Sequence, residues 1–178
     1  MKGIITTRQV VRGAIVAALY AVLTVGLAPI SYGPIQFRLS EALKPLVIWF
    51  PDAIFGIALG TILANLLSPY VGAWELVFMP LTDFAGGVLC WWIGKHFPWL
   101  GVVVYALTTA ASVSLMLNVI TAAPFLPLFV SIGASELILL VGGFPVMRFV
   151  AHILGELLPD VGDSKETSRQ VDKEQVGK

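Results

Sequence analysis

The segment ISYGPIQFRLSEALKP, residues Ile30–Pro45, interrupts an otherwise apolar chain and decides how that chain can fold. Gly33 and Pro34 stop a helix that arrives from the N-terminal side, because proline lacks an amide hydrogen and disfavours helical geometry in the preceding residue. Helix can resume near Ser40, whose hydroxyl can accept a hydrogen bond from a first-turn amide, with Glu41 where the helix dipole favours an anion. The segment is either an ordinary polar loop between two helices or part of a binding site.

The composition predicts an all-α integral membrane protein. Hydrophobic residues make up 57% of the chain and charged residues only 12%, whereas soluble domains are about 25% charged. The formal net charge is zero, which gives no indication of nucleic-acid binding. The single cysteine, Cys90, lies within an apolar run, so we interpret it as a small buried side chain and predict neither an internal disulfide nor a thiolate metal site.

The apolar stretches predict the number of membrane crossings. They span residues 9–28, 40–50, 52–67, 74–94, 99–121 and 126–157, and we interpret the first as a retained helix, not a cleaved signal peptide. The second covers about 18 Å at 1.5 Å per residue, less than the ~30 Å hydrocarbon core. It is therefore either a short crossing or a re-entrant half-helix, which leaves six or five crossings.

The distribution of lysine and arginine favours six crossings with both termini in the cytoplasm, because most of these side chains then lie on the cytoplasmic side. We therefore predict a six-helix domain over residues 1–159 in the plasma membrane. Residues 160–178 are polar, mixed in charge and without aromatic side chains, which predicts a disordered cytoplasmic tail.

In this topology, polar side chains from separate segments collect in the outer half of the membrane. The candidates for ligand binding are Tyr32, Arg38, Glu41, Asn65, Trp74, Asp83, Asn118 and Glu136. An ionised carboxylate at mid-membrane costs about 2.5–3.5 kcal/mol on insertion scales, so it normally faces protein or a watery cavity. The convergence of these residues predicts a pocket that opens outward.

Several of these side chains have alternative interpretations that the sequence leaves open. Asp83 can hydrogen-bond within the bundle, and Trp74 can be an interfacial anchor instead of a stacking surface. Asn118 suits either a helix–helix hydrogen bond or a pocket wall. Lys44 lies one turn from Glu41 and can pair with it, whereas Glu75, beside the membrane interface, is expected to be solvated.

Small residues recur at helical spacing in the first and third apolar stretches. Ala14, Ala17, Ala18 and Ala21 form overlapping pairs four residues apart, and Gly56, Gly60 and Ala64 form a similar stripe. Such spacing lets two helix backbones approach closely. The glycine stripe is expected to pack within the bundle, whereas the alanine face suits either the bundle or a partner subunit.

No enzyme chemistry is predicted. His96 and His152 lie toward the cytoplasmic side, away from the outer polar residues, and the chain has no metal-ligand spacing, nucleophile elbow or phosphate-binding glycine loop. A membrane protein that binds a ligand outside without ATP chemistry is a channel, a secondary carrier, a receptor or one subunit of a pump.

Two segments narrow this choice. ALYAVLTVGLAPISYGPIQFRLSEALKPL, residues Ala18–Leu46, resembles the QueT family of substrate-binding (S) subunits of energy-coupling factor (ECF) transporters, and ALGTILANLLSPYVGAWELVF, residues Ala58–Phe78, resembles the next block of that family. The most distinctive piece is RLSEAL, residues Arg38–Leu43. The resemblance covers about a third of the chain, and the remainder agrees in length and in the number of apolar stretches.

The resemblance implies a six-helix S subunit that captures a queuosine precursor, aminomethyl-deazaguanine or a related deazapurine, outside the cell. A transmembrane coupling subunit and two ATPase subunits would then drive uptake, so ATP would be used by these partners and this chain would carry no cofactor. The coupling subunit would contact the alanine face formed by Ala14, Ala17, Ala18 and Ala21.

The chemistry of such a ligand suggests roles for the candidate residues. Glu41 and Glu136 would accept hydrogen bonds from the deazaguanine edge and from the aminomethyl cation, in an order that the sequence does not assign. Arg38, Asn65 and Asn118 would contact polar ligand atoms, and Trp74 or Tyr32 would stack on the ring. Two alternatives remain, an S subunit for another vitamin-like ligand and a solitary small secondary carrier or channel.

Overall fold

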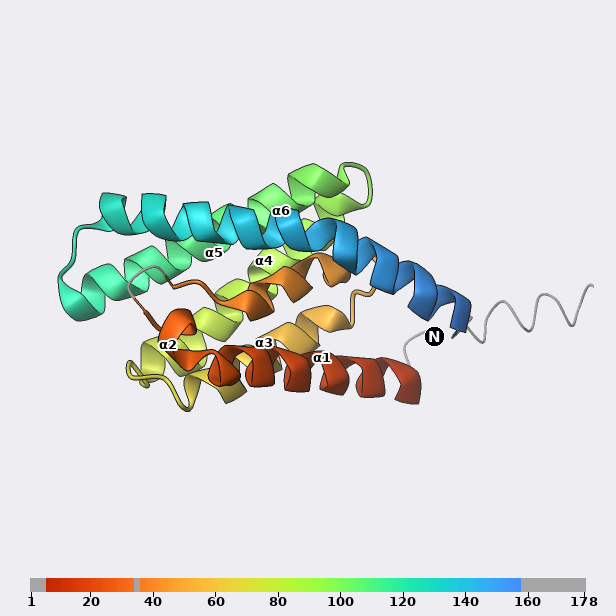
Figure 1. The fold of residues 1–178 in the computed structure, drawn as a ribbon, viewed down its shortest axis with the longest axis horizontal. Helices are drawn as coiled ribbons and strands as arrows, with labels where there is room; N and C mark the ends of the chain where they lie inside the picture. Colours follow the sequence, from red (N-terminus) through yellow and green to blue (C-terminus); the bar gives the residue numbers. More distant parts are fainter. Residues whose placement is uncertain (1–5, 34–35, 158–178) are drawn as a thin grey trace, which may run out of the picture.

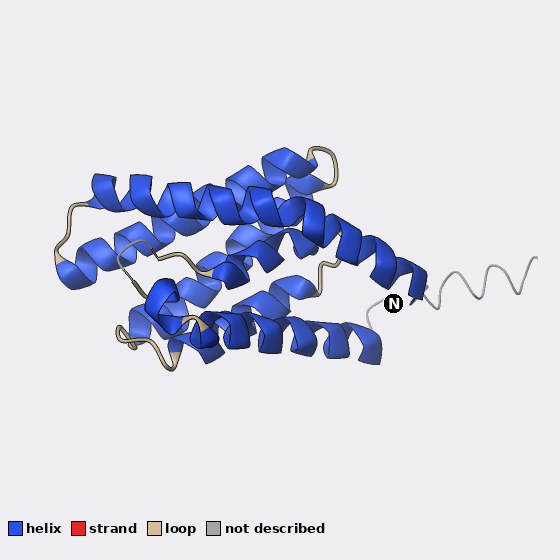
Figure 2. Cartoon of the chain, viewed as in Figure 1, coloured by secondary structure: helices blue, strands red, loops and turns tan. Residues whose placement is uncertain are grey.

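A computed structural model of the chain describes residues 6–33 and 36–157, and within these ranges all regular structure is helical (Figure 2). The predicted tail lies outside the described residues. The elements are α1 (Thr7–Gly26), α2 (Ala28–Ser31), η1 (Leu39–Ile48), α3 (Ala53–Asn65), η2 (Trp74–Phe78), α4 (Met79–Gly94), α5 (Pro98–Thr121) and α6 (Phe125–Leu157).

The helices run back and forth between two ends of the bundle (Figure 1). The connections that follow α1, α3 and α5 lie at one end, and those that follow η1 and α4 lie at the other, together with the start of α1 and the end of α6. Four helical segments are long and apolar enough to cross a membrane, namely Thr7–Gly26, Trp74–Gly94, Pro98–Thr121 and Phe125–Leu154. The chain is therefore a multi-pass membrane protein, with η1 and α3 as shorter helices among these four.

The short helix η1 is a 3₁₀-helix and begins just after Arg38. Because a 3₁₀-helix has three residues per turn, side chains three positions apart lie one above the other. This period places Arg38, Glu41 and Lys44 in one row along η1. The predicted cap by Ser40 is wrong: its hydroxyl lies 2.6 Å from the Thr24 hydroxyl, and no side chain caps the start of η1.

The glycine stripe of α3 packs against α1, as expected. A Cβ atom on Gly56 would lie 2.5 Å from the Gly13 carbonyl oxygen, and one on Gly60 would lie 2.8 Å from Cβ of Tyr20. Ala17 is only 2% exposed because α3 covers this side of α1, so packing within the bundle accounts for this member of the alanine face. Ala14 and Ala18 are exposed and Ala21 is half-buried.

Two adjacent glycines of α6 differ in how closely they approach η1. A Cβ atom on Gly143 would lie 2.6 Å from the Ala42 carbonyl oxygen of η1, whereas one on Gly142 would have no atom within 4 Å. We expect Gly143→Ala to destabilise the protein by about 1–3 kcal/mol, as overpacking does. Gly142→Ala should be neutral or stabilising, because alanine is the better helix former by about 0.8–1 kcal/mol. Thermal unfolding in detergent compares them, and equal melting temperatures would contradict the close approach of α6 to η1.

Candidate functional site

Lys44 is the centre of a buried ion network. Its Nζ atom donates to Asp83 Oδ1 at 2.6 Å and to Thr109 Oγ1 at 2.9 Å, and it forms an ion pair with Glu41. The other oxygen of Asp83 accepts a hydrogen bond from the Thr61 hydroxyl at 2.6 Å. The predicted pairing of Lys44 with Glu41 is thus confirmed, and both oxygens of Asp83 already have partners within the bundle, which favours the structural interpretation of this residue.

Glu41 also has partners for both of its oxygens. The Tyr20 hydroxyl donates to Oε1, and Lys44 pairs with Oε2. The side chain is 2% exposed and Tyr20 is fully buried. These contacts reduce the hydrogen-bonding capacity that Glu41 keeps for a ligand, because a carboxylate that is already paired gains less from a further donor.

Arg38 has several partners, but only its hydrogen bond to Gln36 is of ordinary length. Its Nε atom lies 3.4 Å from the Ser31 carbonyl oxygen, Nη1 lies 3.4 Å from Asn65 Oδ1, and Nη2 lies 3.1 Å from Gln36 Oε1. The distance from Nη2 to Glu75 Oε1 is 3.9 Å. Two of the three hydrogen bonds exceed the usual 2.7–3.2 Å, so this buried guanidinium keeps donor capacity for a further acceptor.

The charge of Arg38 is maintained by its surroundings. Burial on its own would lower its pKa, but the neighbouring phenol of Tyr20 and the carboxylates of Glu41 and Glu75 outweigh burial and raise it. The guanidinium therefore stays a cation, and it also lies 5.4 Å from the centre of the Tyr32 ring.

Glu75 is fully buried, and the expectation that it is solvated is wrong. It lies in the π-helix η2, and the Asn65 amide donates to its backbone carbonyl oxygen at 2.9 Å, which holds this segment against α3. Neither carboxylate oxygen of Glu75 has a hydrogen-bond partner among the residues that the structure describes. Single π-helical turns are frequent at functional sites.

Glu136 adds a fourth buried carboxylate, from α6. It is 2% exposed, and its Oε2 atom has no hydrogen-bond partner within the described ranges. Its carboxylate interacts electrostatically with Glu41, Lys44, Asp83 and Arg38, in that order of strength. We name six residues the charged cluster: Arg38, Glu41, Lys44, Glu75, Asp83 and Glu136.

The charged cluster is closed to solvent. None of its six residues is more than 4% exposed, so the prediction of a pocket that opens outward is wrong for this conformation. The physical reason is the packing of η1 against α6, α1 and α4, which seals the row of charges that η1 carries. The predicted convergence of Arg38, Glu41, Asp83 and Glu136 is nevertheless confirmed.

Of the remaining predicted site residues, some lie near the charged cluster and others make contacts elsewhere in the bundle. Tyr32 donates its hydroxyl to the Ala64 carbonyl oxygen at 2.7 Å, and Asn65 contacts Arg38. Trp74 is 38% exposed and packs edge-on against Phe78. Asn118 donates to the Ala123 carbonyl oxygen at 2.7 Å and so stabilises the turn that ends α5.

Gln36 belongs to the site but was not among the predicted residues. It is 3% exposed, and its backbone has φ = 53°, in the left-handed region that residues other than glycine seldom adopt. Its side-chain oxygen accepts the hydrogen bond from Arg38 described above. The available signal was its position in the polar segment Ile30–Pro45, two residues before Arg38.

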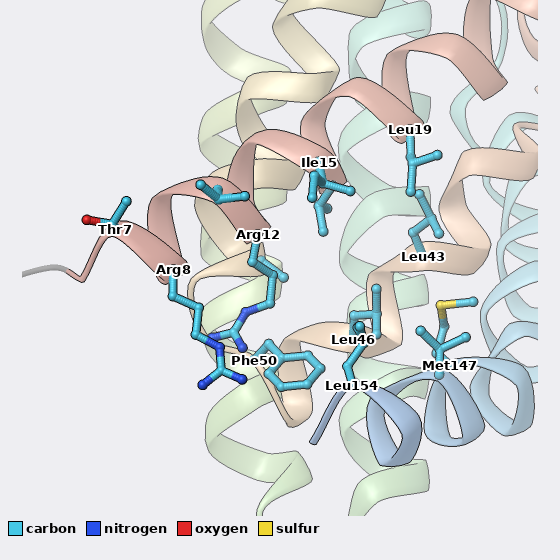
Figure 3. Close-up of a pocket in the computed structure, with 14 residues that line it drawn as sticks. Thr7, Arg8, Arg12, Ile15, Leu19, Leu43, Leu46, Phe50, Met147 and Leu154 are labelled. Carbon is cyan, nitrogen blue, oxygen red and sulfur yellow. The ribbon is translucent and has the colours of Figure 1, made fainter. Parts of the chain in front are cut away.

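The open cavities of the bundle differ in character from the charged cluster. A groove of about 520 Å³ runs between α1, η1 and α6 (Figure 3), and its lining is almost entirely apolar, with Ile15, Leu19, Leu46 and Met147 along it. A second groove of about 460 Å³ lies between α1 and α3. A polar planar ligand needs a few precisely placed polar groups. The polar residues of these two grooves are Thr7, Arg8, Gln9, Arg12 and Asp52, and their one carboxylate, Asp52, is paired with Arg12. A third cavity of about 560 Å³ is lined by Arg148 and His152 but by no carboxylate. The charged cluster has four buried carboxylates that can accept from the donors of such a ligand, so it is the candidate site.

Comparison with known proteins assigns the chain to a family. The family model described as QueT transporter matches residues 10–152. The chain belongs to the QueT transporter family. All six members of the charged cluster lie within the part that matches the QueT family, and membership makes the chain a transport protein and not an enzyme.

One curated relative is the queuosine precursor transporter QueT of Lactococcus lactis subsp. cremoris (strain MG1363). It is 47% identical to this chain over 64 residues, which are 35% of this chain and 38% of the relative. The match thus covers little more than a third of that relative's length. No solved structure matches the chain.

Proposed function

We propose that this chain is the S subunit of an ECF transporter and captures aminomethyl-deazaguanine or a related deazapurine at the outer face of the plasma membrane. Membership of the QueT family and the name of the L. lactis relative support this proposal. The observation that carries it is the presence, in the charged cluster, of buried carboxylate oxygens that have no hydrogen-bond partner among the described residues. A buried charge of this kind is costly unless it is paired, and a cationic, donor-rich ligand supplies the missing partner.

The charge balance of the cluster suits a cation. Four carboxylates (Glu41, Asp83, Glu75 and Glu136) face two cations (Arg38 and Lys44), so the cluster has two negative charges in excess when all six groups are ionised. The aminomethyl group of the ligand is a primary ammonium. Glu136 is the carboxylate to receive it, because its Oε2 atom has no hydrogen-bond partner among the described residues.

The proposed orientation has six crossings, both termini in the cytoplasm and the charged cluster in the outer half. Arg8 and Arg12 lie at the start of α1, Lys95 directly follows α4, and Arg148 lies in the C-terminal half of α6. Figure 1 shows the start of α1, the end of α4 and the end of α6 at the same end of the bundle, which suits the cytoplasmic side. The connections after α1, α3 and α5 would then face outward. Because the cluster is closed, part of this outer end must move to admit the ligand.

The partners of the proposed complex are a transmembrane coupling subunit and two ATPase subunits, which would use ATP while this chain carries no cofactor. On α1, the exposed Ala14 and Ala18 are available to the coupling subunit, and the half-buried Ala21 extends this surface. Small residues favour close contact between helices in lipid.

Binding titrations of the purified chain test the proposed ligand and the role of Glu136. We expect wild type to bind aminomethyl-deazaguanine and its methyl analogue, which lacks the amine, but not riboflavin. Glu136→Gln should weaken binding of the aminomethyl compound by roughly 10- to 100-fold, the worth of one charge-assisted hydrogen bond, and leave the methyl analogue nearly unaffected.

A matched control for this change is Asp52→Asn, which also replaces a carboxylate by an amide. Asp52 pairs with Arg12 at 2.5 Å, at the opposite end of η1 from Arg38, so its loss should leave both affinities unchanged. Binding of riboflavin instead of deazapurines would contradict the proposed ligand. Uptake by this chain alone in vesicles without ATP would contradict the S-subunit role and support a solitary carrier.

A further inference from the structure

Glu75 is the member of the charged cluster with the most unused hydrogen-bonding capacity. It is fully buried, and among the described residues neither of its oxygens has a partner at ordinary hydrogen-bond distance. Its weaker contacts are an interaction with the Ser68 hydroxyl and the ion pair with Arg38. The Ser68 hydroxyl accepts a hydrogen bond from the Tyr70 amide at 3.1 Å. By contrast, Asp83 accepts a hydrogen bond at each oxygen, and Glu41 accepts one from Tyr20 and forms a much closer ion pair, with Lys44.

Arg38 and Glu75 lie side by side, and their backbones are fixed by different elements. Nη2 of Arg38 is 3.9 Å from Oε1 of Glu75, too far for a hydrogen bond but close enough for an ion pair. Asn65 connects the two, since its Oδ1 atom faces Arg38 and its amide nitrogen bonds the Glu75 carbonyl oxygen. The two charged groups therefore present guanidinium donors beside a carboxylate whose oxygens have no partner at ordinary hydrogen-bond distance among the described residues.

A guanine-type ring presents the complementary sequence of groups along one edge: a carbonyl acceptor, a ring N–H donor and an amino donor. We propose that Arg38 and Glu75 together read this edge of the deazapurine, with Arg38 donating to the ring carbonyl and Glu75 accepting from the ring N–H and the amino group. This inference rests on the proposed function and assigns a ligand contact to Glu75.

The same geometry directs the aminomethyl cation away from Glu75. Arg38 is a neighbouring cation, which repels an ammonium group at that position and favours a neutral donor edge. Among the described residues the Oε2 atom of Glu136 has no hydrogen-bond partner, and Glu136 forms no ion pair with Arg38 or Lys44, so it keeps an acceptor for the ammonium. Glu75 and Glu136 thus bind different parts of one ligand.

The test compares aminomethyl-deazaguanine with the analogue that lacks only the ring amino group, using isothermal titration of the full chain in detergent. Wild type should prefer the compound with the amino group. Glu75→Gln should weaken binding of that compound by roughly 10- to 100-fold, because charge-assisted hydrogen bonds are lost. It should weaken binding of the analogue less, so that the preference for the amino group falls.

Each outcome separates this inference from the proposed function. If wild type binds neither compound, the proposed function fails. If Glu75→Gln binds both compounds as wild type does, or weakens both equally, the edge assignment to Glu75 is wrong while the proposed function stands. Should Glu75→Gln fail to fold, Glu75→Asp, which keeps the charge but withdraws it by one methylene, should still lose the preference for the amino group. Asp52→Asn is the control that should leave the preference intact.

Discussion

Replacing Lys44 by alanine should destabilise the protein by about 3–5 kcal/mol, the usual cost of removing one partner of a buried ion pair. Lys44 is fully buried and pairs with both Glu41 and Asp83. Without its ammonium group, two carboxylates would remain in the apolar interior with no cation between them. In thermal unfolding in detergent, this change corresponds to a fall in melting temperature of roughly 6–20 °C.

A double variant tests the physical reason for this loss. Asp83→Asn removes one of the two carboxylates that Lys44 compensates, so Lys44→Ala with Asp83→Asn should be more stable than Lys44→Ala alone. The amide that Asp83→Asn introduces can still accept the hydrogen bond from Thr61 through its oxygen. If Lys44→Ala unfolds at the wild-type temperature, the ion network does not support the bundle.

Replacing Arg38 by alanine should weaken ligand binding by roughly 30-fold or more, since truncating one partner of a buried charge pair costs about 2–5 kcal/mol. The guanidinium lies between Gln36, Asn65 and Glu75 and is the only cation beside Glu75 among the described residues. Its loss would remove the proposed donor to the ring carbonyl and leave Glu75 without a compensating charge.

The conservative variant Arg38→Lys separates charge from geometry. Lysine keeps the positive charge but lacks the planar fork that allows several donors to reach different acceptors. We expect an affinity between those of wild type and Arg38→Ala in the same titration. Wild-type affinity in Arg38→Ala would show that the ligand binds elsewhere in the bundle.

The order of the elements was predictable because the apolar stretches are separated by proline, glycine and charge. The six stretches correspond to α1, η1, α3, the η2–α4 segment, α5 and α6, with boundaries that agree to within a few residues. Four of these segments suffice in length and composition to cross a membrane. The collection of Arg38, Glu41, Asp83 and Glu136 in one region was also predictable, because carboxylates in apolar helices avoid lipid.

Other features depend on contacts that no local pattern encodes. Glu75 follows a loop and precedes an apolar run, a position typical of a solvated residue, yet the hydrogen bond from Asn65 and the π-helical turn bury it. Asn118 has the spacing of a pocket residue, but its amide donates to the backbone carbonyl of Ala123 in the turn that follows α5. The burial of Glu75 and the hydrogen bond of Asn118 both depend on which backbone and side-chain polar groups the neighbouring elements leave without a partner.

The amino-acid sequence was enough to predict a helical membrane protein, the positions of its helices and the gathering of buried charges around Arg38–Leu43. Apolar length and the cost of charge in lipid act locally along the chain, so these features can be predicted without the fold. Which of the charges find partners depends on how the helices pack. Lys44 can pair with Asp83 only because α4 packs beside η1, and the 3₁₀ geometry of η1 aligns Arg38, Glu41 and Lys44. Among the described residues, that packing leaves both oxygens of Glu75 and the Oε2 atom of Glu136 without a hydrogen-bond partner.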